Sequence, residues 1–87
     1  MQESIIFSDK EILLMYKNIG KNVKKCREEK GLSQLQLSHS MGYSSVSLVS
    51  AAELASDNKH FNLEHLYKIS KILDIELSYL ISVNAAE

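Results

Sequence analysis

The sequence predicts an all-α fold, a compact bundle of five helices, and three observations indicate it. Apolar residues recur at helical spacing along most of the 87 residues, and no window alternates with the period of two that strands require. The chain has no proline and only 3 glycines, which leaves few helix breakers. Ser or Asn precedes several apolar segments, where a side-chain oxygen caps a helix start. Five helices with short connections are therefore expected.

The first helix is expected to be extended and to span residues 9–30. Ser8 and Glu11 form the pattern of a capping box at its start, and Gly31 suits its end. Gly20 interrupts the helix without breaking it. One apolar stripe is expected to face the core, formed by Ile12, Tyr16, Ile19, Val23 and Cys26.

A short second helix is expected over residues 34–41, opened by a capping box of Ser33 and Gln36 and ended by Gly42. The third helix follows after a tight turn and extends up to residue 55. A turn of this length holds two helices at roughly 90–120°, the helix-turn-helix arrangement, in which the second helix enters the DNA major groove.

The start and the inner face of the third helix follow from the same pattern. Ser44 or Ser45 is expected to cap it. Its apolar residues at i, i+3 and i+6 are expected to point inward: Leu48, Ala51 and Leu54.

The last two helices complete the bundle. A polar loop over residues 56–60 leads to a fourth helix over 63–73, which Asn62 caps. A short fifth helix is expected over 76–82. The inward residues expected in the fourth helix are Leu66, Ile69, Ile72 and Leu73, and the apolar residues of the fifth are Leu77, Leu80 and Ile81.

Charge and cysteine content exclude several classes of protein. The net charge is −1, but residues 17–30 carry six basic residues against two acidic ones. This excess indicates either a phosphate-facing surface or a solvated helix face with i,i+4 ion pairs. Cys26 is the only cysteine, so no intrachain disulfide forms, and it is expected to be a small buried hydrophobe.

Catalysis, metal binding and membrane insertion are not expected. The three histidines, His39, His60 and His65, lack metal-ligand spacing. No acid is placed to complete a nucleophile–base arrangement, and we expect no enzyme activity and no cofactor. No apolar run approaches the ~18 residues of a membrane span, and no leader pattern is evident, so a cytoplasmic location is expected.

The order of residues over 19–81 resembles the XRE family, the helix-turn-helix proteins of the phage Cro and lambda-repressor type. The resemblance rests on Ile19-Gly20, Val23, Arg27, the run 28–34, Leu37, Met41-Gly42, 62–66, Ile69, Leu73, Leu77 and Leu80-Ile81. It implies a lambda-repressor-like five-helix fold, double-stranded DNA as the partner, and dimers on near-palindromic operators. We expect one domain over 1–87, with 1–18 as an N-terminal extension to a family-like core over 19–81.

The resemblance also implies roles for individual residues. Base edges would be read by Ser44, Ser45, Val46 and Ser50. The DNA backbone would be contacted by Gln34, Asn58, Lys59 and His60.

The chain departs from the family pattern at several positions. Ser38 stands where the family usually has alanine, and the glutamate of the third helix, Glu53, comes one residue late. Arg27 is expected to form a structural ion pair, with Glu53 as the candidate partner. The loop after the third helix is about two residues longer than usual, which leaves the position of Lys59 and His60 relative to DNA open.

An apolar run at the start of the first helix exceeds what a small bundle buries. It is expected either to fold back as a lid or, the interpretation favoured here, to form a subunit interface. The C-terminal helix is the competing interface. The candidate dimer contacts are Ile12, Leu13, Met15, Leu77 and Ile81.

The leading hypothesis is a small transcriptional regulator, a repressor, that reads a near-palindromic operator as a homodimer through its third helix. The alternative is an antitoxin-like or other protein-interaction module on the same fold, with a toxin or other protein as its partner and weak or no DNA binding.

Overall fold

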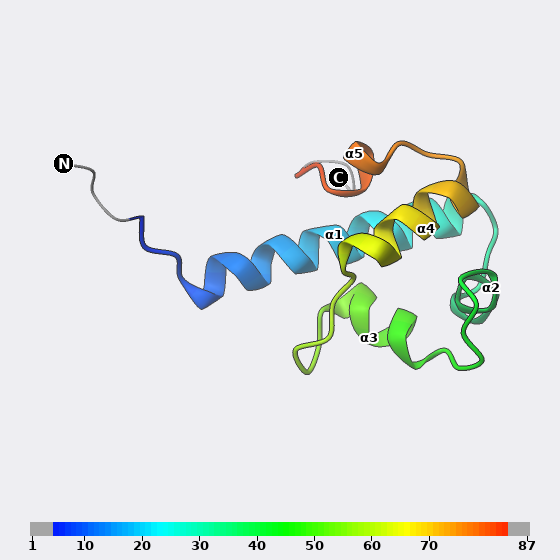
Figure 1. Ribbon diagram of the computed structural model, residues 1–87, viewed down its shortest axis with the longest axis horizontal. Coiled ribbons are helices and arrows are strands. Elements are labelled where there is room, and N and C mark those ends of the chain that lie inside the picture. The colour runs from blue at the N-terminus through cyan, green and yellow to red at the C-terminus, as the bar shows by residue number, and fades with distance from the viewer. Residues whose placement is uncertain (1–4, 84–87) are drawn as a thin grey trace.

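The computed structural model describes residues 5–83, and its regular elements are all helical (Figure 1). The helices are α1 (Asp9–Glu29), α2 (Gln34–Ser40), α3 (Ser47–Leu54), α4 (Leu63–Leu73) and α5 (Leu77–Leu80). The predicted all-α class is confirmed. In the described part of the chain, no helix is long and apolar enough to cross a membrane.

The predicted helix starts of α1 and α2 are confirmed. The Ser8 hydroxyl accepts the Glu11 N–H at 3.1 Å, and the Glu11 carboxylate accepts the Ser8 N–H at 2.8 Å. Ser33 and Gln36 form the same reciprocal pair at the start of α2. These bonds satisfy backbone donors that the first turn of a helix leaves unpaired.

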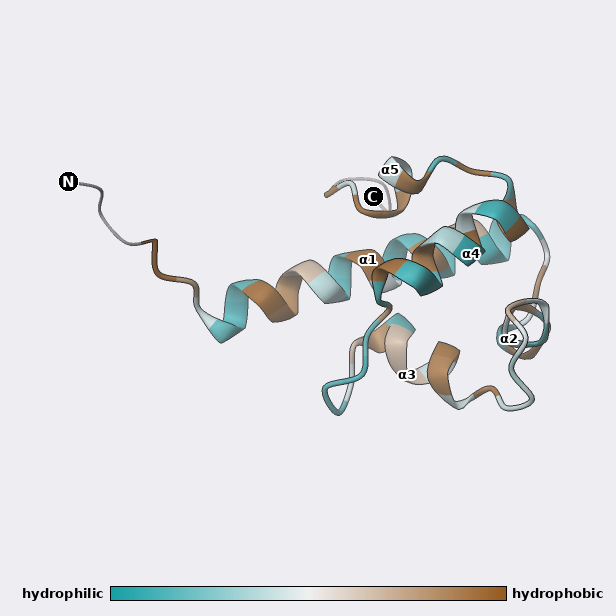
Figure 2. Ribbon diagram, in the orientation of Figure 1, coloured by the Kyte–Doolittle hydropathy of each residue, from teal (hydrophilic) through white to brown (hydrophobic). Residues whose placement is uncertain are grey.

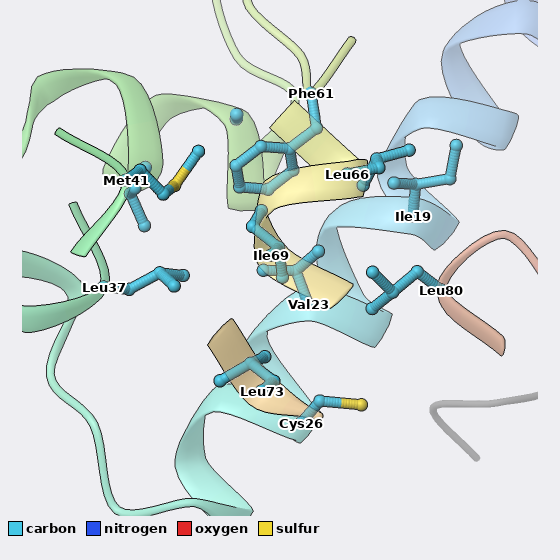
Figure 3. Packing of buried hydrophobic residues seen from close by; sticks show 12 residues of the cluster. Ile19, Val23, Cys26, Leu37, Met41, Phe61, Leu66, Ile69, Leu73 and Leu80 are labelled. Atoms are coloured by element: carbon cyan, nitrogen blue, oxygen red, sulfur yellow. The ribbon is translucent and has the colours of Figure 1, made fainter. Parts of the chain in front are cut away.

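A single apolar core lies between α1 and α4 and includes side chains of α2, α3 and α5 (Figure 3). Phe61, Ile69 and Leu73 are at most 1% exposed. Each large apolar side chain buried in this way contributes about 1.5–3 kcal/mol. The other core residues are Ile19, Val23, Cys26, Leu37, Met41, Val49, Ala52, Leu66 and Leu80.

Helices α1 and α3 cross at Gly20, where their backbones are in direct contact. A Cβ atom at Gly20 would lie 2.3 Å from the carbonyl oxygen of Glu53 and 2.8 Å from that of Ala52. Only glycine permits this approach, so the residue that interrupts the helical pattern of α1 is the one that seats α3 on it.

The fifth helix is shorter than predicted. We expected residues 76–82, whereas α5 is Leu77–Leu80. The Asn22 side-chain amide donates to the carbonyls of Leu80 and Ser82 at 2.8 Å each, and Asn18 donates to that of Ser82 at 2.8 Å. The two asparagine side chains of α1 thus donate to carbonyls at the end of α5 that have no partner within the helix. These bonds stabilise the end of α5 at Leu80.

The N-terminal half of α1 projects beyond the bundle (Figure 1). Ile12 was expected on the buried stripe but is 40% exposed, because no other helix extends that far along α1. Residues 5–7 do not fold back as a lid, and apolar residues recur along the projecting part as far as Ile5, the first residue described (Figure 2). The exposed members are Ile5, Ile6, Phe7, Ile12, Leu13, Leu14 and Met15.

Replacing Gly20 by alanine is expected to destabilise the fold by about 1–3 kcal/mol, because the new methyl group meets backbone atoms that cannot rotate away. The loss appears despite the ~1 kcal/mol by which alanine favours a helix interior. Urea unfolding followed by circular dichroism measures it.

The exposed Lys21→Ala variant, one position along α1, is the matched control and should change stability by less than about 0.5 kcal/mol. A Gly20→Ala protein as stable as this control would contradict the assigned contact.

Candidate nucleic-acid interface

The turn between α2 and α3 is fixed by Ser38, which is fully buried. Its carbonyl accepts the Tyr43 N–H at 3.0 Å, and its hydroxyl donates to the carbonyl of Ser45. Gly42 has φ +95°, a conformation that glycine adopts without strain. The serine that departs from the family's alanine therefore holds both ends of the turn.

The predicted cap of α3 is wrong. Neither Ser44 nor Ser45 is the N-cap, which is Val46, and Val46 has no side-chain capping bond. The Ser45 hydroxyl instead accepts the N–H of Ser47 at 3.0 Å, across two residues. This short-range bond takes the place of a regular cap because the turn closes one residue later than the pattern suggests.

The predicted inward face of α3 is right only in part. Leu48 is half-buried and packs against the core, and Ala51 is half-buried, whereas Leu54 is 67% exposed. The most deeply buried residues of α3 are Val49, Ala52 and Glu53. The physical reason is the crossing at Gly20, which brings Ala52 and Glu53 against α1 and rotates Leu54 outward.

An ion pair inside the protein ties α3 to α1, as the sequence predicted. Arg27 donates from Nε and Nη2 to the two carboxylate oxygens of Glu53 at 2.7 and 3.0 Å. The hydrogen bond to Glu53 raises the pKa of Arg27, against an opposing effect of burial. Arg27 also donates to the Leu32 carbonyl at 2.8 Å, and Gln34 donates to Glu53 at 2.9 Å. One carboxylate thus joins α1, α2 and α3.

Glu53 also constrains Gln34, a residue expected to bind a DNA phosphate. Its side chain is half-buried and oriented by the bond to Glu53. The position at the start of α2 stays as predicted, but the Gln34 amide has a structural partner that the sequence did not reveal.

Three of the four residues expected to read bases lie together on the serine edge, the exposed stretch from Ser44 to Ser47. Ser44, Ser45 and Val46 are exposed at the start of α3. Ser50 is half-buried, and its hydroxyl donates to the Ser47 carbonyl at 3.2 Å, which leaves it set back from the edge. Ser47 is exposed beside Ser45 and was not among the predicted base-reading residues. Its place in the first turn of α3 follows from the helix start at Ser47.

The residues of the 55–60 loop that were expected to contact the DNA backbone do not lie together. Lys59 is exposed and lines the same surface hollow as Ser44, Ser45 and Ser47. His60 instead stacks on Tyr16 of α1, with ring centroids 3.7 Å apart and planes at 12°. Asn58 is exposed and has φ 60°, in the left-handed region that asparagine tolerates. Lys59 is therefore the member of this group beside the serine edge.

The basic stretch of α1 lies apart from this edge. Lys21, Lys24 and Lys25 line a separate hollow with Glu28 and Glu29, and every residue of that hollow belongs to α1. It shares no lining residue with the hollow at the serine edge. Both signs of charge line this hollow, and the two alternatives that the sequence left open, a phosphate-facing surface and a solvated face, both stay predictions.

An aromatic cluster supports the other wall of the hollow. The Tyr43 and His65 rings meet edge to face at 6.1 Å, and Lys68 Nζ lies 5.7 Å from the Tyr43 ring centre. His65 Nδ1 accepts the Asn62 N–H at 3.0 Å, and Asn62 accepts the His65 N–H at 2.8 Å. Burial lowers the pKa of His65, so the neutral form that this capping box needs is favoured.

Cysteine chemistry and metal-ligand clusters were the other candidate sites in the described part of the chain. Cys26 is buried, and burial raises the pKa of its thiol, which disfavours the reactive thiolate. Within residues 5–83, no three His, Cys, Asp or Glu side chains are grouped as metal ligands.

Two short helices held across a tight turn, with an exposed edge at the start of the second, define a helix-turn-helix protein. A helix-turn-helix family model matches residues 23–80, and the chain belongs to this family, of the XRE type. It is a DNA-binding helix-turn-helix regulator, and the family is generally non-enzymatic. No curated protein and no solved structure matches the chain.

Breaking the buried ion pair is expected to be costly. Arg27→Met leaves the Glu53 carboxylate buried without its cation, which destabilises by about 3–5 kcal/mol. The double variant Arg27→Met/Glu53→Leu should recover much of that loss, since neither charge then remains. Urea unfolding of both single variants and the double variant gives the coupling free energy. Additive losses would show that the pair is not coupled.

Stability is expected to fall in acid partly through His65. Because its folded-state pKa is lowered, the unfolded chain takes up the proton first as the pH drops below about 6.5, and the stabilisation is lost between that value and the lower folded one. His65→Gln keeps an acceptor for the capping box and removes the titration. The difference in stability between the two proteins should shrink or reverse over this pH interval when measured by urea unfolding. A pH-independent difference would contradict the prediction.

Proposed function

We propose that this protein is a repressor that binds a near-palindromic operator as a homodimer, with Ser44, Ser45, Val46 and Ser47 against base edges. The observation that carries the proposal is the exposed serine edge at the start of α3, next to Lys59. In a helix-turn-helix protein these are the residues that reach into the major groove. Ser50 stays as a proposed reader set further back.

The chemistry of this edge suits recognition by many small contacts. Serine hydroxyls donate to or accept from any base pair, and Val46 offers an apolar contact for a thymine methyl group. Neither supplies the bidentate bonds by which Arg selects guanine. Specificity would therefore draw on water-mediated contacts and on the deformability of the operator.

Contacts to the DNA backbone would come from Lys59 and Asn58 in the loop and from Gln34 at the start of α2. His60 would support the loop from behind through its stack on Tyr16. Lys59 lines the serine-edge hollow, so each protomer of the proposed dimer would hold one lysine close to the DNA backbone.

A homodimer would place two α3 helices in successive major grooves about 34 Å apart. Repression then needs only that the dimer occupies its operator. We assign the whole chain to one DNA-binding domain whose N-terminal extension, residues 1–18, carries further contacts.

The protein-interaction module stays as a second candidate because of one observation, the seven exposed apolar residues before Tyr16. An antitoxin-like protein would use them to hold a different chain. A tightly bound second protein that co-purifies, together with no DNA affinity at low salt, would favour this candidate over the repressor.

Two substitutions separate affinity from specificity. Lys59→Gln is expected to weaken binding about equally for all sequences and to reduce the slope of log K against log salt by roughly two, since the homodimer loses one phosphate contact in each protomer. Val46→Ala should instead change the preferred base at one or two positions, since it removes a methyl contact. Gel shifts with fragments from upstream of its own gene measure both.

Lys71→Gln is the matched control and should leave the salt slope unchanged. Lys71 is an exposed lysine of α4, and it lines a different surface hollow from the one at the serine edge. The proposal fails if the unmodified protein shows no binding at low salt, or no sequence preference at physiological salt.

A further inference from the structure

The projecting half of α1 carries more exposed apolar surface than a small monomer usually leaves uncovered. The seven apolar residues between Ile5 and Met15 are 40–89% exposed. Ile5, Ile6 and Phe7 precede α1 and supply more than half of this exposure, while the four residues on the helix amount to about two whole large residues, roughly 300–400 Å². A standard interface needs about 800 Å² from each partner, so a dimer formed here would draw on the segment before the helix as well as on α1.

The charges on the projecting half form a pattern that fits a second copy of the same helix. Asp9, Leu13 and Lys17 follow one another at i, i+4 and i+8 and therefore share one stripe of α1. All three are exposed. Two such helices packed antiparallel about Leu13 would place each Asp9 against the other chain's Lys17. A parallel pair would instead oppose like charges at both positions.

We propose that the occupant of this surface is a second copy of the chain, packed antiparallel along the Asp9–Leu13–Lys17 stripe with Leu13 on the two-fold axis. The proposal rests on the homodimer of the proposed function and names its surface. Leu13 supplies the apolar contact on the axis, and the two Asp9–Lys17 pairs fix the direction.

The same stripe runs alongside the loop that carries Lys59. A surface hollow is lined by Asp9, Ile12 and Leu13 from α1 and by Lys59 and His60 from the loop. A partner helix seated on the stripe would therefore also lie against this loop. Dimerisation would restrict the motion of Lys59 and so reduce the entropy lost when it binds a phosphate.

The competing surface at the C-terminus is smaller. Leu77 was expected to be a dimer contact but is half-buried and packs against the core, and Leu80 is fully buried. The exposed apolar residues that remain there are Tyr79, Ile81 and Val83. They stand on or just after a helix of 4 residues and lack the charge pattern of the α1 stripe.

Charge reversal on the full-length protein tests the inference by sedimentation equilibrium. Asp9→Lys alone and Lys17→Asp alone should each weaken self-association by on the order of tenfold, because each places like charges together. The double variant Asp9→Lys/Lys17→Asp should restore it. Lys71→Asp, a charge reversal at an exposed residue of α4, away from the projecting half of α1, is the matched control and should leave the association constant within about twofold.

Leu13→Asp and Ile81→Asp separate this inference from the proposed function. Loss of the dimer in Leu13→Asp, with Ile81→Asp unaffected, supports the α1 surface. Loss in Ile81→Asp alone, or no rescue in the charge-swapped double variant, overturns the inference while leaving a homodimeric repressor intact. A monomer at all concentrations overturns both. A dimer through α1 that binds no DNA overturns the proposed function alone.

Discussion

The backbone contact between α1 and α3 at Gly20 is the constraint on which the rest of the structure depends. It allows Ala52 and Glu53 to lie directly against α1, and the buried Arg27–Glu53 pair forms beside it. Because an ion pair in the interior is costly unless its geometry is good, the crossing and the pair fix one orientation of α3. That orientation buries Val49 and turns the edge from Ser44 to Ser47 outward.

A second set of polar bonds transmits this orientation to neighbouring segments. Glu53 accepts from Gln34, so the start of α2 follows α3. Ser38 bonds to both ends of the turn, and Asn22 holds the last helix on α1. The core supplies most of the stability, but it is non-directional. These few buried donors and acceptors decide how the helices meet, and the exposed serine edge is the consequence.

More of the fold than of the candidate site could be predicted from the sequence. Local signals fixed the starts of α1, α2 and α4, because Ser-x-x-Glu, Ser-x-x-Gln and a leading asparagine act within one turn. The exposure of Leu54 was mispredicted because periodicity alone does not show that the backbone of α3 lies directly against α1 at Gly20. His60 was placed near DNA because the stack on Tyr16 is equally non-local. Ser47 was missed because the helix start was assigned one or two residues early.

Helix α1 is uninterrupted from Asp9 to Glu29, so its projecting side chains and its contact with α3 share one rigid rod. Each residue of an α-helix adds about 1.5 Å of rise and about 100° of rotation. An insertion or deletion between Met15 and Gly20 would rotate the projecting apolar residues about the axis of α1 relative to the serine edge. A substitution would leave their relative orientation unchanged. Length variation in this interval is consequently far more disruptive than change of residue type.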